Sequence, residues 1–145
     1  EGADVDQAGA VRMLSELVFV PTAFLEDYVR WEAVDDDRAR VFLEYAHGEV
    51  SAMCHFDKRG AIVSMVAERC REQRGESRRV SWSTPLGDYI DADGFRIPGE
   101  GAAIWHLDSG PFEYVRLTIE DVQYGVGNQL TDGSDEADTG LQLAG

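Results

Sequence analysis

The sequence predicts an α+β domain: a curved antiparallel sheet of about seven or eight strands, connected as a meander, packed on one N-terminal helix. Apolar residues recur at helical spacing near the start of the chain, and from Val29 onward they alternate with polar residues as in half-buried strands. Clusters rich in Gly, Asp and Pro separate the alternating stretches. Because no second helical stretch lies between strands, the pattern excludes a βαβ arrangement.

The helix is expected to begin near Asp4 or Asp6, either of which can cap it, and to run to about Val18. Its apolar stripe consists of Val11, Leu14, Leu17 and Val18, and its other face carries Arg12, Ser15 and Glu16. Pro21 ends the helical pattern, since proline cannot continue a helix. We expect the apolar stripe to pack on the concave side of the sheet.

Strands are expected over residues 29–33, 39–45, 50–56, 61–69, 80–84, 88–97 (a short hairpin), 102–107 and 112–124. Residues 57–60 predict a hairpin turn, and residues 71–79 predict a charged loop. Apolar residues on both strand faces indicate either that both faces are covered or that one lines a groove. The chain is therefore expected to form one domain over residues 1–124, followed by an acidic mobile tail over residues 125–145, which has no Lys, Arg or aromatic residue.

The charge is strongly acidic, with 13 basic and 28 acidic residues and a net charge of −15. This balance argues against nucleic-acid binding and against docking on anionic membranes, both of which need basic surfaces. Lys58 is the only lysine, and such a composition suits a halophilic protein that stays soluble in concentrated salt. The alternative explanation is the codon bias of a GC-rich genome. No apolar run is long enough to span a membrane.

The two cysteines are predicted to be free, because the expected hairpin register separates Cys54 and Cys70 by roughly 23 Å. Free thiols fit a cytoplasmic location. His47, His55 and His106 show no metal-ligand spacing with these cysteines, so no metal site is expected. Residues 99–104 begin like a dinucleotide-binding loop but lack its third glycine and precede a strand, so no cofactor is expected either.

Two sets of residues are candidates for function. Acid–base catalysis would use His55 or His106 with Glu68 or Asp88, since a histidine and a carboxylate in a half-dry cavity form a proton-transfer pair. The alternative is that these are outward-facing residues on a solvated sheet. An apolar ligand would be bound by Trp31, Phe42, Trp82, Trp105, Phe112 and Tyr114. The alternative for the tryptophans is ordinary core packing.

Several motifs resemble those of one prokaryotic domain family of unknown function. They are Asp6-Gln7, Val11-Arg12-x-Leu14, Glu16-x-Val18-Phe19-x-Pro21-Thr22-Ala23 and Val29-Arg30-Trp31-Glu32, followed by Gly87-Asp88-Tyr89, Phe95-Arg96-Ile97-Pro98, Trp105 and Gly110-Pro111-Phe112-x-Tyr114. The resemblance covers residues 4–124. It departs from the family at Phe19-Val20, where the family commonly has Trp-Phe before the proline.

This resemblance implies that the chain is the C-terminal half of a longer protein, similar to the half-barrels of lipoprotein carriers. It implies no activity. Three hypotheses follow: a non-enzymatic domain that binds an apolar or lipid-like ligand in a sheet concavity, a small hydrolase or isomerase with a histidine–carboxylate pair, and a structural half-domain. The half-domain would need a partner, either a second copy or a missing N-terminal half.

Overall fold

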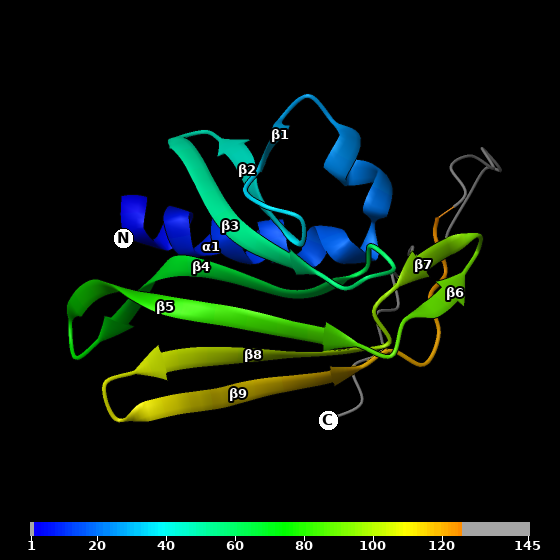
Figure 1. Cartoon of the computed structure of the whole chain (residues 1–145). Helices are drawn as coiled ribbons and strands as arrows, with labels where there is room; N and C mark the ends of the chain where they lie inside the picture. Colours follow the sequence, from blue (N-terminus) through cyan, green and yellow to red (C-terminus); the bar gives the residue numbers. More distant parts are fainter. Residues whose placement is uncertain (1, 126–145) are drawn as a thin grey trace, which may run out of the picture.

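The computed structural model describes residues 2–125 and confirms the α+β class (Figure 1). Helix α1 (Ala3–Glu16) leads into two short 3-10 helices, η1 (Leu17–Phe19) and η2 (Pro21–Leu25). The strands are β1 (Val29–Ala33), β2 (Arg38–Tyr45), β3 (Gly48–Phe56), β4 (Ile62–Gln73), β5 (Glu76–Gly87), β6 (Ile90–Ala92), β7 (Phe95–Ile97), β8 (Glu100–Leu107) and β9 (Gly110–Thr118). The predicted acidic tail lies outside the described residues, apart from Gly125.

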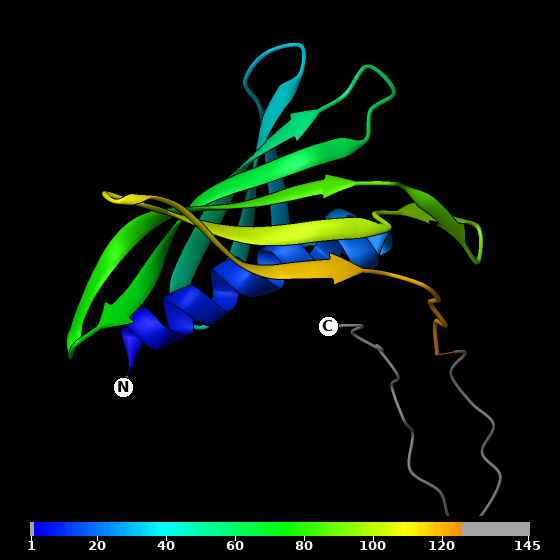
Figure 2. The same ribbon diagram turned by 90° about the horizontal axis from the view of Figure 1, so that it is seen from below.

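Seven strands form one antiparallel sheet in the order β1-β2-β3-β4-β5-β8-β9, so chain neighbours pair as in a meander. The small β6–β7 hairpin is inserted between β5 and β8 and forms a second sheet at the end of the molecule away from the start of α1 (Figure 1). The large sheet is bent, and α1 lies against one of its sides, across β2, β3 and β4 (Figure 2). This arrangement agrees with the predicted curved meander on a helix.

The core lies between α1 and the sheet. Its most deeply buried side chains are those of Val11, Leu14, Val41, Leu43, Cys54 and Met65, each at most 1% exposed. The predicted stripe of the helix and the predicted inward positions of β2 and β3 are therefore in the core. Cys54 and Cys70 are both free, as predicted, and both are buried. Within residues 2–125, no helix is long and apolar enough to cross a membrane.

The start of the helix differs from the prediction. Gly2 is the N-cap, no side chain caps the helix, and Asp4 and Asp6 lie in its first turn, where their charges still favour the positive end of the helix dipole. Ser15, expected on the outer face, is buried and donates a hydrogen bond to the Arg12 carbonyl at 2.7 Å. The concave sheet surrounds a wider arc of the helix than a flat sheet would, so the buried stripe is broader than the apolar pattern.

The prediction of a charged loop at residues 71–79 was also wrong. Strands β4 and β5 continue as a long hairpin in which Gln73 pairs with Glu76, and only Arg74 and Gly75 form the turn, both with positive φ. Polar residues on both faces do not prevent strand pairing in a ribbon that is exposed to solvent on both sides. The last strand is shorter than expected, because β9 ends at Thr118 and the next residue, Ile119, packs in a small core beside β6 and β7.

Gln7 closes a gap in the sheet. Strands β3 and β4 pair only over Met53–Phe56 and Ile62–Val66, and beyond this stretch their backbones separate. The Gln7 side chain, 6% exposed, donates to the Glu68 carbonyl at 2.8 Å and accepts from the Cys70 backbone N–H at 2.8 Å. A helix side chain thus satisfies two β4 backbone groups that β3 leaves unpaired.

Candidate functional site

A cavity of about 710 Å³ opens at the end of the sheet near β6 and β7. Its wall comes mainly from η2, the β3–β4 hairpin and the end of β5 with its connection to β6, and β1 and β7 contribute Trp31 and Arg96. The lining residues are Val18, Pro21, Phe24, Leu25, Trp31, Phe56, Asp57, Arg59, Gly60, Ala61, Ile62, Val63, Leu86, Gly87, Asp88, Tyr89 and Arg96. We call this space the rim cavity. Its size and its mainly apolar wall are typical of small-molecule sites.

Three aromatic rings form one side of the rim cavity. The ring centroids of Phe24 and Trp31 are 5.4 Å apart, and those of Trp31 and Phe56 are 6.3 Å apart. The Trp31 indole N–H donates to the Phe24 carbonyl at 3.2 Å, which fixes the indole against η2. Leu25 is 86% exposed beside these rings. The η2 turn therefore leaves Leu25 exposed beside the cavity, whereas Phe24 of the same turn packs half-buried against the core.

The β3–β4 hairpin forms a lip of the rim cavity and is held by hydrogen bonds. One Asp57 carboxylate oxygen accepts the backbone N–H groups of Arg59 at 2.8 Å and Ala61 at 3.0 Å, and these bonds lower the pKa of Asp57. The Tyr89 hydroxyl donates to the Ile62 carbonyl at 2.7 Å, and burial raises the pKa of Tyr89 to about 12. The Asp57 hydrogen bonds hold the turn of the hairpin together, and the Tyr89 hydrogen bond joins the start of β4 to the segment between β5 and β6.

Gly99 fixes the position of Asp88 at the mouth of the rim cavity. Its backbone N–H donates to the carbonyls of Gly87 and Asp88, each at 3.0 Å. A Cβ at position 99 would lie 2.2 Å from the Asp88 carbonyl oxygen, which no side chain can tolerate. The glycine that begins the incomplete dinucleotide motif therefore permits a close approach of two backbone segments.

The predicted ligand-binding residues do not gather around one space. Trp31 lines the rim cavity. Phe42 is elsewhere: the Arg30 guanidinium lies over the Phe42 ring, with 3.8 Å between the guanidinium carbon and the ring centroid. Trp82 and Trp105 are buried, at 3% and 8% exposure, and belong to the core. The two remaining residues, Phe112 and Tyr114, are exposed on the edge strand β9 and stack with a centroid distance of 6.4 Å.

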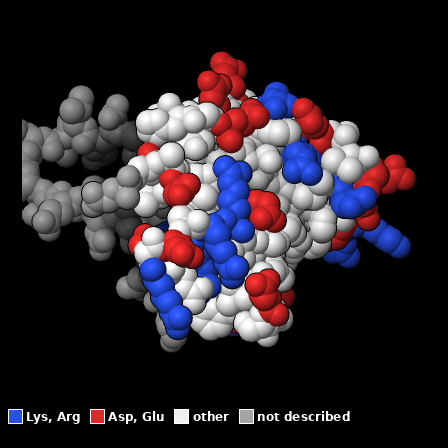
Figure 3. Space-filling view, turned by 90° about the vertical axis from the view of Figure 1, so that its left-hand side faces the viewer, with Lys and Arg blue, Asp and Glu red and all other residues white. Residues whose placement is uncertain are grey.

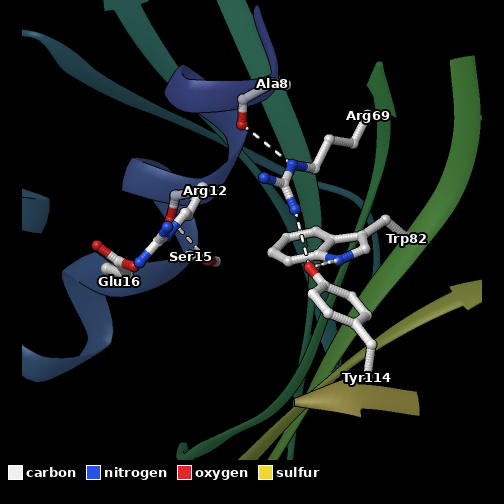
Figure 4. A network of polar contacts seen from close by, with 7 residues as sticks. All are labelled: Ala8, Arg12, Ser15, Glu16, Arg69, Trp82 and Tyr114. Atoms are coloured by element: carbon white, nitrogen blue, oxygen red, sulfur yellow. Dashed lines mark hydrogen bonds and ion pairs between the residues drawn. The ribbon is translucent and has the colours of Figure 1, made fainter. Parts of the chain in front are cut away.

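Arg69 links two of these aromatic residues, Trp82 and Tyr114, to helix α1 (Figure 4). Its guanidinium donates to the Ala8 carbonyl at 3.0 Å and to the Tyr114 hydroxyl at 2.9 Å, and it lies 4.8 Å from the Trp82 ring centroid. The Trp82 indole N–H also donates to the Tyr114 hydroxyl, at 3.0 Å. These hydrogen bonds join α1 to β4, β5 and β9 and fix the Tyr114 ring beside Trp82.

The predicted catalytic residues are also dispersed. His55 Nδ1 lies 3.4 Å from Ser64 Oγ, and His106 Nε2 lies 2.8 Å from Ser83 Oγ, so each histidine faces a serine rather than a carboxylate. Glu68 is exposed. Asp88 lines the rim cavity, and no histidine of the described residues does.

The surface carries both charges unevenly. On the face that Figure 3 shows, Lys and Arg side chains gather in a band across the middle, and Asp and Glu side chains surround it. No group of three or more His, Cys, Asp or Glu side chains in the described part of the chain is arranged to hold a metal ion.

Several lining residues were missed from the sequence, chiefly Phe24, Phe56, Leu86 and Tyr89. Phe56 and Leu86 have the same alternating pattern as core residues, and only the bend of the sheet turns them toward an opening. A usable signal was the short apolar turn after Pro21, where Leu25 follows Phe24 and precedes an acidic stretch.

Comparison with known proteins gives a family but no activity. The chain matches the model of a family of unknown function, DUF6544, over residues 1–117. In the comparisons with curated proteins and with solved structures, nothing matches this chain. The match spans α1 and the large sheet almost to the end of β9, and it includes all the residues that line the rim cavity. The chain therefore belongs to the DUF6544 family of unknown function.

Proposed function

We propose that the domain binds a small apolar molecule in the rim cavity, without catalysing a reaction on it. The observation that carries this proposal is a mainly apolar wall around a space of about 710 Å³, in which Leu25 and Trp31 are exposed and Phe24 and Phe56 are half-buried. Exposed apolar surface in a concave site favours ligand binding, because a ligand removes that surface from water. The site proposed here is at the end of the sheet, and of the six ligand residues predicted from sequence it keeps only Trp31.

The arrangement of polar groups supports binding over acid–base catalysis. Asp88 is the one predicted catalytic residue at the cavity, and within residues 2–125 it has no histidine beside it there. His55 and His106 are paired with serines outside the cavity. The half-domain hypothesis, with a second copy or an N-terminal half as partner, stays a prediction that size-exclusion chromatography with light scattering tests.

Titration with Nile red, a neutral dye that fluoresces in apolar surroundings, tests the proposal. We expect saturable binding by the wild type and about tenfold weaker binding by Trp31→Ala, because that variant loses a large part of the apolar wall. Phe112→Ala is the matched control, since Phe112 is an exposed aromatic residue on β9 that does not line the cavity. Circular dichroism confirms that both variants are folded.

Two outcomes would overturn the proposal. If the wild type does not bind the dye, the cavity is not an apolar binding site. If Phe112→Ala weakens binding and Trp31→Ala does not, the ligand surface is the aromatic group on β9 and not the rim cavity.

A further inference from the structure

The rim cavity is lined by two arginines whose guanidinium groups make no side-chain hydrogen bond in the described part of the chain. Arg59 and Arg96 both line the cavity, and neither guanidinium forms a side-chain hydrogen bond within residues 2–125. Arg96 has one ion pair, to Asp91 at 3.9 Å, and both side chains are more than half exposed. Lys58, the only lysine of the chain, is exposed beside Arg59 in the same hairpin.

Two carboxylates, Asp57 and Asp88, line the cavity together with these arginines, and beyond its backbone hydrogen bonds, the nearby charges of Arg59 and Arg96 contribute to lowering the pKa of Asp57. Asp57 is held by the backbone N–H groups of its own hairpin. Asp88 lines the cavity but makes no ion pair within 4 Å of either arginine in the described part of the chain. Each guanidinium offers five N–H donors, so the lip presents an excess of donors next to an apolar wall.

We infer that the rim cavity takes an amphipathic anion: an aliphatic or aromatic carboxylic acid whose apolar body lies against Trp31 and whose carboxylate meets Arg59 and Arg96. This inference rests on the proposed function and adds the chemical class of the ligand. A carboxylate accepts charge-assisted hydrogen bonds from a guanidinium, often two in parallel, which gives the head group a defined place. The apolar wall supplies most of the affinity, and the two arginines supply the choice of head group.

The experiment compares three ligands with the same ten-carbon scale and different charge: decanoate, 1-decanol and decyltrimethylammonium. Isothermal titration calorimetry measures each directly, below its micellar concentration, in 0.15 M and 1 M KCl. We expect decanoate to bind about tenfold more tightly than the cationic ligand at 0.15 M, with a smaller difference at 1 M because salt screens exposed charges.

The double variant Arg59→Gln/Arg96→Gln should bind decanoate about fivefold to tenfold more weakly than the wild type, because the charge-assisted bonds are lost. Its loss of affinity for 1-decanol and Nile red should be clearly smaller than its loss for decanoate. The matched control is Arg78→Gln/Arg116→Gln, which removes the same charge from two arginines paired with Asp108 and Glu113 outside the cavity. All four side chains are exposed, so the variants should fold.

The outcomes separate this inference from the proposed function. If the wild type binds 1-decanol and Nile red but does not prefer decanoate, or if both double variants lose the same decanoate affinity, the inference is overturned and the apolar site stands. If no ligand of the series and no dye binds, both are overturned. A preference for decyltrimethylammonium would assign the mouth to Asp88 instead of the arginines.

Discussion

The part of the sheet under α1 and the end of the sheet at the rim cavity contain similar side chains in opposite surroundings. Under the helix, Leu14 and Leu43 are at most 1% exposed. At the rim, Leu25 is 86% exposed, and Trp31 and Val63 are 36% and 38% exposed. The first region is covered along its length by a helix, whereas the rim is formed by η2, the ends of strands and the turns between them.

The difference separates what stabilises the domain from what is available for a ligand. Burial of a leucine stabilises a fold by about 1.5–3 kcal/mol, and exposed apolar residues contribute little of this. The exposed apolar side chains at the rim are thus not covered by any other element of the described residues. The comparison predicts that variants under the helix change stability, whereas variants at the rim change binding.

The largest expected effect is that of Leu14→Ala. Leu14 is fully buried between α1 and the sheet, so the variant loses transfer free energy and leaves a cavity, and we expect about 2–5 kcal/mol lower unfolding free energy. Urea unfolding monitored by circular dichroism measures the loss. Met13→Ala, at a neighbouring position that is 52% exposed, should change stability by less than about 0.5 kcal/mol. Equal losses for the two variants would show that α1 is not the cover of the core.

Gln7→Leu should have the next largest effect. The variant keeps the side-chain volume but leaves the Glu68 carbonyl and the Cys70 backbone N–H without partners, and an unsatisfied buried group costs about 1–3 kcal/mol. Hydrogen exchange at the Cys70 amide should accelerate as well. Glu72→Leu, on the exposed continuation of β4, is the control. A stable Gln7→Leu protein with unchanged exchange would mean that water replaces the glutamine, and the gap between β3 and β4 would then be open to solvent.

The fold was largely predictable because period and packing agree in it. In α1, Val11 and Leu14 recur at helical spacing, and in β2, Val41 and Leu43 lie at alternating positions. All four side chains are buried in the core, as these patterns predict. One error fell where backbone pairing does not depend on burial. The ribbon at 71–79 is polar on both faces, and its turn needs only Arg74 and Gly75 in the left-handed region.

The candidate site was less predictable, because its residues come from segments that meet only through the bend of the sheet. Trp31 and Asp88 were predicted as functional residues for different reasons, and the structure places both at the rim cavity. Alternation within a strand cannot tell a residue of the core from one at an opening, which is why Trp82 and Trp105 had the same pattern as Trp31. A residue at the rim differs from one in the core in whether another element covers it. The neighbouring residues in the sequence do not show this.

The smallest effect concerns alkaline pH and tests how firmly the lip of the rim cavity is attached. Burial raises the pKa of Tyr89 from 10.0 to about 12, so between these values the unfolded chain loses this proton while the folded protein keeps it. Stability therefore falls as pH rises from about 10 to about 12. Cys54, whose pKa burial raises from 9.0 to about 12, adds to the same fall. Tyr89→Phe should lose about 1 kcal/mol at pH 7, for the hydrogen bond to Ile62, and should melt with a shallower dependence on pH above 10. Tyr28→Phe, at a residue 41% exposed, should keep the wild-type dependence. An unchanged slope for Tyr89→Phe would mean that its ring is solvated in the folded protein, and the lip would then be a loosely held part of the cavity wall.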